Sequence, residues 1–177
     1  MKTLYLHLEN GSVQSVQVDM GIPVLVPSEI PVQLPGNRAV DVPYSVSGKE
    51  ERITCVSMGN PHCVVFVKDV DSLNLEKIGP EFEHAPIFPE RVNTEFIQVV
   101  NDAEVKMRVW ERGSGETLAC GTGACASTVA CVLNHKTGRK VLLHLRGGDL
   151  TVNWDEKTGS VFMEGPAEFV FDGKIEI

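Results

Sequence analysis

The sequence predicts an α+β fold in which a mostly antiparallel β-sheet curves around one central apolar helix. Residues 122–134 carry no charged side chain, so this helix lacks the polar stripe of a surface helix and is expected to be enclosed on most sides. The segments around it show alternating apolar residues and turn dipeptides, which are typical of strands. The β-rich remainder of the chain therefore supplies the enclosure.

The first predicted element is a β-hairpin. Residues 3–9 lead to the turn dipeptide Asn10-Gly11, and Val13, Val16 and Val18 follow on the return strand. Between Met20 and Pro43 the chain contains five prolines, which exclude a regular helix. This stretch is predicted to be a connector near a domain boundary.

Strand patterns dominate the rest of the chain, interrupted by two helices. A short helix is predicted to begin near Asp71 or Ser72 and to end at Gly79-Pro80, and the central helix spans about 121–134. The predicted strands after the opening hairpin are 52–57, 62–68, 94–101, 104–110, 140–146, 149–154, 160–164 and 169–177.

Composition excludes several function classes. A net charge of −8 without a basic patch argues against nucleic acid or an anionic membrane as the partner. The start of the chain does not resemble a signal peptide, and the longest uncharged stretch, 117–135, is too rich in small and polar residues for a membrane span. Five cysteines without framework spacing indicate free thiols in a reducing compartment, so we expect a cytoplasmic protein.

No cofactor is predicted. The cysteines form no Cys-x-x-Cys pair and no two histidines have helical ligand spacing, so a metal site is not expected. Gly-x-Gly-x-x-Gly and Walker-type loops are absent, so nucleotide binding has no support.

Cys120 is the strongest candidate for chemistry. Glycines precede and follow it, and Gly121-Thr122-Gly123 opens the central helix. A thiol and free backbone N–H groups at a helix N-terminus favour a thiolate and can hold a carboxylate. A lone cysteine is more often a small buried hydrophobe, but the glycine-rich context favours the functional interpretation.

Other polar residues allow two interpretations each. Glu111 and Arg112 are either a solvated strand end or a clamp for a zwitterion, in which Arg112 binds a carboxylate. Asn60 either stabilises its own turn or binds a ligand, and His62 either is a structural histidine or tunes a neighbouring group. Asn93 invites the same two interpretations.

Four motifs occur in order and in register. They are Gly59-Asn60-Pro61-His62, Asn93-Thr94-Glu95-Phe96, Trp110-Glu111-Arg112-Gly113 and Ala119-Cys120-Gly121-Thr122-Gly123-Ala124. Together they closely resemble the C-terminal half of the diaminopimelate epimerase family, over nearly the whole chain. That family interconverts LL- and meso-diaminopimelate, in lysine and peptidoglycan precursor biosynthesis, without pyridoxal phosphate or metal. One cysteine removes the α-proton as a thiolate and a second, as a thiol, returns a proton to the opposite face.

The resemblance implies a role for each motif residue. Cys120 is one of the two catalytic cysteines, and the N–H groups of Gly121 and Thr122 bind the reacting carboxylate. The residues implied to recognise the substrate, mainly at its distal amino-acid end, are Asn60, Asn93, Glu111 and Arg112. His62 and Glu111 are implied to adjust the acidity of the thiols, since a thiolate acts as a base only when its pKa is held down.

The family's other cysteine motif, in its first half, has no counterpart before Gly59. Residues 1–20 are therefore expected to be a remnant of the N-terminal domain, 21–167 the C-terminal domain, and 168–177 a terminal strand that pairs with the missing domain. The implied partners are that missing half, the substrate and a second copy in a homodimer. We expect the chain to be inactive alone. The alternatives are a non-catalytic amino-acid-binding or docking half-domain, and a proline racemase-like or PhzF-like isomerase on the same fold.

Overall fold

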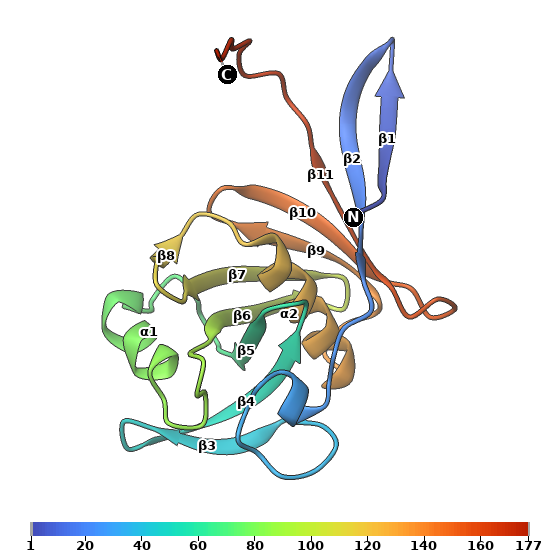
Figure 1. Ribbon diagram of the computed structural model, residues 1–177. Helices are drawn as coiled ribbons and strands as arrows, with labels where there is room; N and C mark the ends of the chain where they lie inside the picture. The colour runs from blue at the N-terminus through green and yellow to red at the C-terminus, as the bar shows by residue number, and fades with distance from the viewer. Residues whose placement is uncertain (1, 177) are drawn as a thin grey trace.

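The structure, a computed structural model, describes residues 2–176, whose strands form one eleven-stranded sheet. The strand order is β1-β2-β11-β10-β9-β7-β6-β5-β4-β3, with β8 beside β7 (Figure 1). Every pairing is antiparallel except β5–β6 and β7–β9. The strands are β1 (Leu4–Glu9), β2 (Ser12–Gly21), β3 (Val42–Val46), β4 (Lys49–Ser57), β5 (Pro61–Phe66), β6 (Asn93–Asn101), β7 (Glu104–Glu111), β8 (Gly115–Thr117), β9 (Lys140–Leu145), β10 (Gly148–Trp154) and β11 (Val161–Pro166).

The central helix α2 (Gly121–Leu133) confirms the predicted architecture. The sheet curves around it, and α2 packs against strands from β4 to β11 (Figure 1). Nine consecutive residues, 123–131, are buried, so every face of the helix is covered. An apolar core of strand residues such as Val56, Ile97 and Leu143 surrounds it. The absence of charges along this helix therefore reflects burial, because an unpaired charge inside that core would be costly.

A second helix, α1 (Leu75–Glu83), covers the opposite side of the sheet and encloses a second apolar core. The prediction that this helix ends at Gly79-Pro80 is wrong, because α1 continues through Pro80. Proline has no backbone N–H, so the helix lacks one hydrogen bond at this position. Burial of Leu75 and Phe82 against the sheet offsets that loss.

The opening hairpin has the predicted turn. Asn10 and Gly11 both have positive φ, 50° and 81°, as a two-residue type I′ turn requires. The hairpin continues into the sheet through β2, which pairs with β11. In Figure 1 the β1–β2 hairpin and residues 167–176 project from the body of the molecule.

Other local predictions need correction. The proline-rich connector packs against the body of the protein, because Ile30, Val32 and Ala39 are buried in the second core and Val24 forms a bridge with Ser57. It also contains the 3-10 helix η1 (Pro27–Glu29), and neither β3 nor β8 was expected. Residues 167–176 form no strand in the described part of the chain, so the terminal strand is not present here. Its pairing with another domain stays a prediction.

Candidate active site

The N-terminus of α2 is built around Cys120. This residue is the N-cap, with an extended backbone, and its Sγ accepts the N–H of Gly123 at 3.4 Å. The side-chain cap of the helix is therefore the thiol itself. Within residues 2–176, the N–H groups of Gly121 and Thr122 have no acceptor, as expected in a first helical turn. They are available to an anion.

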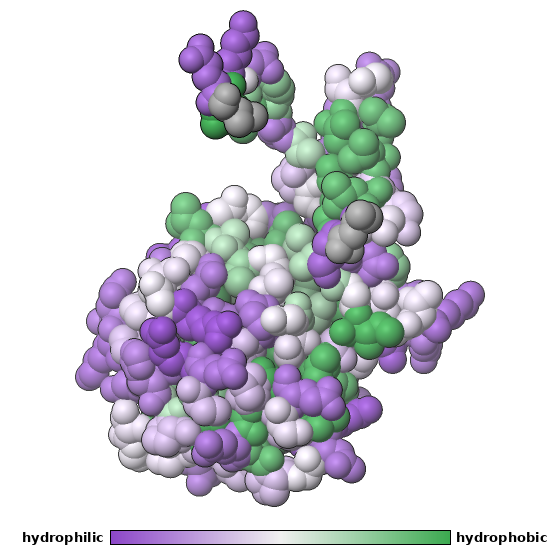
Figure 2. All heavy atoms as spheres, viewed as in Figure 1, coloured by the Kyte–Doolittle hydropathy of each residue, from purple (hydrophilic) through white to green (hydrophobic). Residues whose placement is uncertain are grey.

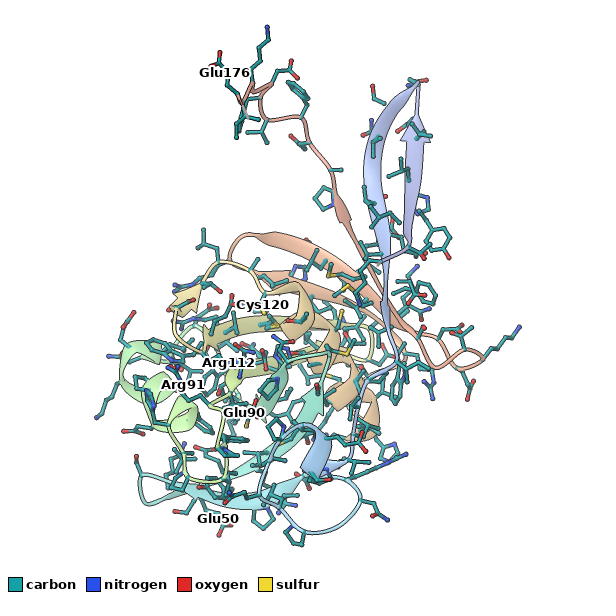
Figure 3. All side chains as sticks on the ribbon, viewed as in Figure 1. Glu50, Glu90, Arg91, Arg112, Cys120 and Glu176 are labelled. Carbon is teal, nitrogen blue, oxygen red and sulfur yellow. The ribbon has the colours of Figure 1, made fainter. Side chains whose placement is uncertain are left out.

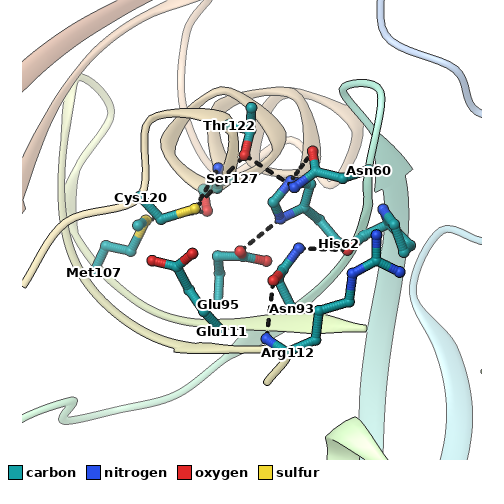
Figure 4. A network of polar contacts seen from close by, with 12 residues as sticks. Asn60, His62, Asn93, Glu95, Met107, Glu111, Arg112, Cys120, Thr122 and Ser127 are labelled. Atoms are coloured by element: carbon teal, nitrogen blue, oxygen red, sulfur yellow. Dashed lines mark hydrogen bonds and ion pairs between the residues drawn. The ribbon is translucent and has the colours of Figure 1, made fainter. Parts of the chain in front are cut away.

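A chain of polar contacts leads from a buried carboxyl group to this thiol (Figure 4). Glu95 Oε1 lies 2.7 Å from His62 Nδ1, and His62 Nε2 lies 3.0 Å from Asn60 Oδ1. The Asn60 amide donates to Thr122 Oγ1 at 3.3 Å, and that hydroxyl lies 3.6 Å from Cys120 Sγ. Strands β5 and β6 bring His62 and Glu95 together because they pair side by side.

The surroundings of Cys120 oppose its ionisation, which corrects the expectation of a favoured thiolate. Burial and the nearby charge of Glu95 raise the pKa of Cys120 to about 11. The bonds from Thr122 and Gly123 act in the opposite direction, but they are weaker. In the described chain Cys120 is therefore a neutral thiol near pH 7, and desolvation outweighs the helix N-terminus.

Glu111 and Arg112 lie at the end of β7 and point to different parts of the site. The carboxylate of Glu111 lies on the side of Cys120 and accepts a hydrogen bond from Thr117 (Figure 4). The guanidinium of Arg112 lies across Asn93 from the thiol and donates to the Glu90 carbonyl at 2.8 Å. Figure 3 labels Arg112 and Glu90, which contact each other, and Cys120.

Two predicted substrate-binding asparagines are engaged within the protein. Asn93, which is 3% exposed, accepts from the Arg112 N–H at 3.0 Å and donates to the Pro61 carbonyl at 3.0 Å. Asn60 contacts His62 and Thr122 as described. Both amides thus hold neighbouring site residues in position, and their contact with a substrate stays a prediction.

Glu83 of α1 was missed by the sequence reasoning. Its carboxylate, 4% exposed, accepts from Trp110 Nε1 at 2.8 Å and from the Gly113 N–H at 2.9 Å, and it pairs with Arg91 at 3.2 Å. Burial opposes the ionisation of Glu83, but the bonds from Trp110 and Gly113 outweigh it and hold its pKa below the ordinary value. Glu83 therefore anchors both ends of the loop that carries Arg112.

Strand β8 fixes the next part of this loop through an ion pair between two largely buried side chains. Arg108 Nε donates to Glu116 Oε1 at 2.8 Å and its Nη2 to Glu116 Oε2 at 3.0 Å, which is the bidentate geometry. Arg108 also donates to the carbonyls of Val70 and Leu73. The segment that precedes Cys120 is thus tied to β7.

Glu95, in the second of the four motifs, is a further site residue to which the sequence interpretation assigns no role. A sequence signal for it exists, because a carboxylate directly precedes the apolar pair Phe96-Ile97 in a predicted strand, where burial demands a partner.

A cavity of about 320 Å³ between α1 and the sheet is lined by residues such as Val65, Phe82 and Phe96 and by none of the predicted site residues. Among residues 2–176, no helix has the length and apolarity to cross a membrane, and no group of three potential ligands could hold a metal ion.

Comparison with known proteins identifies the family. The family model described as diaminopimelate epimerase matches residues 54–170. The diaminopimelate epimerase of Agathobacter rectalis is 54% identical over 184 residues, covering 100% of this chain and 65% of that protein. The chain belongs to the diaminopimelate epimerase family. Diaminopimelate epimerase of Acetivibrio thermocellus is 51% identical over 177 residues, covering 100% of this chain and 63% of that protein.

Solved structures agree on the fold of this epimerase-family chain. A hydroxyproline epimerase from Agrobacterium vitis superposes with a TM-score of 0.63 at 17% identity, over 93% of this chain and 53% of the other. A PhzF-family phenazine biosynthesis protein from Bacillus anthracis gives 0.55 at 17%, over 99% and 64%. The chain spans about 63–65% of the length of the two curated epimerases.

Proposed function

We propose that this chain supplies one half of a cofactor-independent diaminopimelate epimerase, with Cys120 as one of two thiols that exchange the α-proton. The placement of Cys120 at the N-cap of α2, beside the free N–H groups of Gly121 and Thr122, carries the proposal. A substrate carboxylate bound to those N–H groups holds its α-carbon next to Sγ.

As a neutral thiol, Cys120 acts as the proton donor in one direction of the epimerisation. A thiolate on the opposite face of the substrate removes the α-proton and becomes a thiol, and the resulting carbanion takes the S–H proton of Cys120, which becomes a thiolate. The negative charge that develops on the substrate carboxylate is stabilised by the Gly121 and Thr122 N–H groups. A neutral thiol, as the raised pKa of Cys120 provides, is the form that delivers a proton.

Substrate recognition is divided between the two ends of the site. Arg112 extends to the side away from Cys120, where its guanidinium binds the distal carboxylate, and Asn93 and Glu83 hold its loop in place. Glu111 is close enough to affect the thiol, since its charge contributes to the raised pKa of Cys120. Asn60 and His62 set the hydrogen-bond direction at Thr122.

The second thiol comes from another segment, in a homodimeric cytoplasmic enzyme. The other four cysteines among residues 2–176 are buried, and none of them lies at a helix N-terminus. The curated relatives extend beyond the matched region, which leaves room for a second cysteine motif. The 177-residue chain by itself is therefore expected to lack epimerase activity.

The test is exchange of the substrate α-proton. The purified chain is incubated in D₂O with LL-diaminopimelate, alone or with the N-terminal segment of the Agathobacter rectalis relative that precedes the matched region. We expect no LL-to-meso conversion by the chain alone and conversion by the combination, which Cys120→Ser abolishes. Two-way epimerisation by the chain alone, or conversion by the combination with Cys120→Ser, would contradict the proposal.

A further inference from the structure

The contact between Glu95 and His62 has features that packing alone does not require. Both side chains are 0% exposed, and Glu95 Oε1 lies 2.7 Å from His62 Nδ1. The second carboxyl oxygen, Glu95 Oε2, is buried without a hydrogen-bond partner in the described part of the chain. A buried carboxyl group held by one partner contributes little to stability, because the desolvation of its second oxygen is not compensated. Its one interaction is directed at His62.

The neighbouring contacts determine which ring nitrogen of His62 carries a proton. The Asn60 amide nitrogen donates to Thr122 Oγ1, so the amide oxygen faces His62 Nε2 at 3.0 Å. That oxygen can only accept, and therefore Nε2 must donate. Glu95 Oε1 then faces Nδ1, and a proton shared in that contact leaves the proton on Nε2 in place.

The direction of hydrogen-bond donation continues from Asn60 through Thr122 to the thiol of Cys120. Because Thr122 Oγ1 accepts from Asn60, its own proton is free to point to Cys120 Sγ at 3.6 Å. The site also makes room for the carboxyl group, since a Cβ at Gly123 would lie 2.6 Å from Glu95 Oε1. Glu95 thus lies directly beneath the first turn of α2.

We propose that Glu95 is a positioning residue, which holds His62 in the state that donates from Nε2 and so sets the direction of the hydrogen bonds from the imidazole to Cys120. It acts through His62, Asn60 and Thr122 rather than on a substrate. The inference rests on the proposed function only in that Cys120 is the reacting thiol. Its tests use no diaminopimelate, so it fails or holds independently of epimerase activity.

The first test needs no variant. Nitrogen-15 spectra of the His62 ring in the 177-residue chain at pH 7 are expected to show a protonated Nε2. Assignment uses His62→Asn, which removes the resonance. A ring protonated only at Nδ1 overturns the proposal.

The second test compares two variants that both lack the carboxylate charge. In Glu95→Gln the new carboxamide can donate to Nδ1 and keep the Nε2–H form, whereas Glu95→Ala leaves Nδ1 without a partner. Alkylation of Cys120 by iodoacetamide is measured against pH, with Cys120→Ser identifying the labelled peptide. We expect the midpoint for Glu95→Ala to lie about half a pH unit or more above that for Glu95→Gln, because only the latter keeps the Thr122 hydroxyl directed at Sγ.

The charge of Glu95 gives a further expectation. Glu95→Gln is expected to have a lower midpoint than the parent chain, since the carboxylate charge raises the pKa of Cys120. Identical midpoints for the two variants, with the same His62 ring spectrum in both, would show that Glu95 only fills space. If Glu95→Ala does not fold, the His62 spectra of the parent chain and of Glu95→Gln decide: loss of the Nε2 proton in either overturns the proposal.

Discussion

The thiol of Cys120 shows how burial competes with the field of a helix at the scale of one residue. Raising its pKa from 9.0 to about 11 disfavours the thiolate by about 3 kcal/mol. The Thr122 hydroxyl and the Gly123 N–H at the helix N-terminus favour the charged form. Because Cys120 is only 8% exposed, the cost of desolvating a thiolate is larger than either effect. Desolvation therefore decides the resting state, and the sulfur keeps its proton.

Alkylation of Cys120 should consequently depend steeply on pH. Only the thiolate reacts, so we expect the rate with iodoacetamide to rise about tenfold per pH unit from pH 7 to 10 and to level off near 11. Mass spectrometry of the Cys120 peptide measures it. Cys125, whose pKa burial raises to about 12, serves as the internal comparison and should react later. A plateau below pH 8 would contradict this expectation.

Replacement of Arg112 tests whether the substrate must carry a second charged end. If the proposed function holds, Arg112→Met removes the planar donor proposed for a distal carboxylate, and we expect about 10- to 100-fold weaker binding of diaminopimelate. Calorimetric titration of the chain combined with the N-terminal segment measures this affinity. Arg52→Met is the matched control, because Arg52 pairs with Asp41 on the exposed surface. Unchanged affinity would instead favour a proline racemase-like substrate with one charged end.

Helix α1 shows how an element far from the thiol shapes the site. Its Glu83 binds the indole of Trp110 and the backbone of Gly113, on either side of Glu111 and Arg112. Gly79 lies against the same indole, and a Cβ there would come within 2.2 Å of Trp110 Cδ2. The close approach of α1 to β7 thus depends on glycine at a helix position.

Replacement of Gly79 separates helix propensity from packing. In an isolated helix, Ala is favoured over Gly by about 1 kcal/mol. In this fold we expect Gly79→Ala to lower the free energy of unfolding by about 1–3 kcal/mol, because the indole must move. Urea denaturation measures the change. The control is Gly138→Ala, where the nearest atom to the added Cβ is 3.7 Å away. Stabilisation by Gly79→Ala would show that α1 shifts freely.

The whole molecule presents an apolar arm, defined here as the exposed face of the β1–β2 hairpin. Leu4, Leu6 and Leu8 alternate along β1 and pair with Val18, Val16 and Val13 of β2, so that one face is entirely apolar. The three leucines are 55–65% exposed, and Figure 2 shows the green surface that results. Such a patch on an edge strand is typical of a surface that another chain or domain covers.

Self-association of the 177-residue chain should depend on this arm. We expect concentration-dependent oligomers in light scattering, and Leu6→Lys with Leu8→Lys should shift the chain to a monomer because charges on the apolar face oppose contact. Val100→Lys, at another exposed apolar position, is the control and should have no effect. A parent chain that stays monomeric at all concentrations would contradict this expectation.

Features that depend on residues close together in the sequence were predictable from it. The buried helix was evident from the uncharged run 122–134, and the hairpin from Asn10-Gly11, whose turn needs positive φ at both residues. The four motifs also placed Cys120 at the start of α2. These features are determined by backbone preferences and apolar periodicity, which act over a few residues.

Only the tertiary structure decided the state of the site. It showed that Cys120 is a buried thiol, that His62 is paired with Glu95, and that Glu83 of α1 holds the loop of Arg112. It also showed that α1 continues through Pro80, because burial compensates for the missing hydrogen bond. The physical reason is common to all of them: desolvation and hydrogen-bond partners come from residues distant in sequence, and these meet only when the sheet closes around α2.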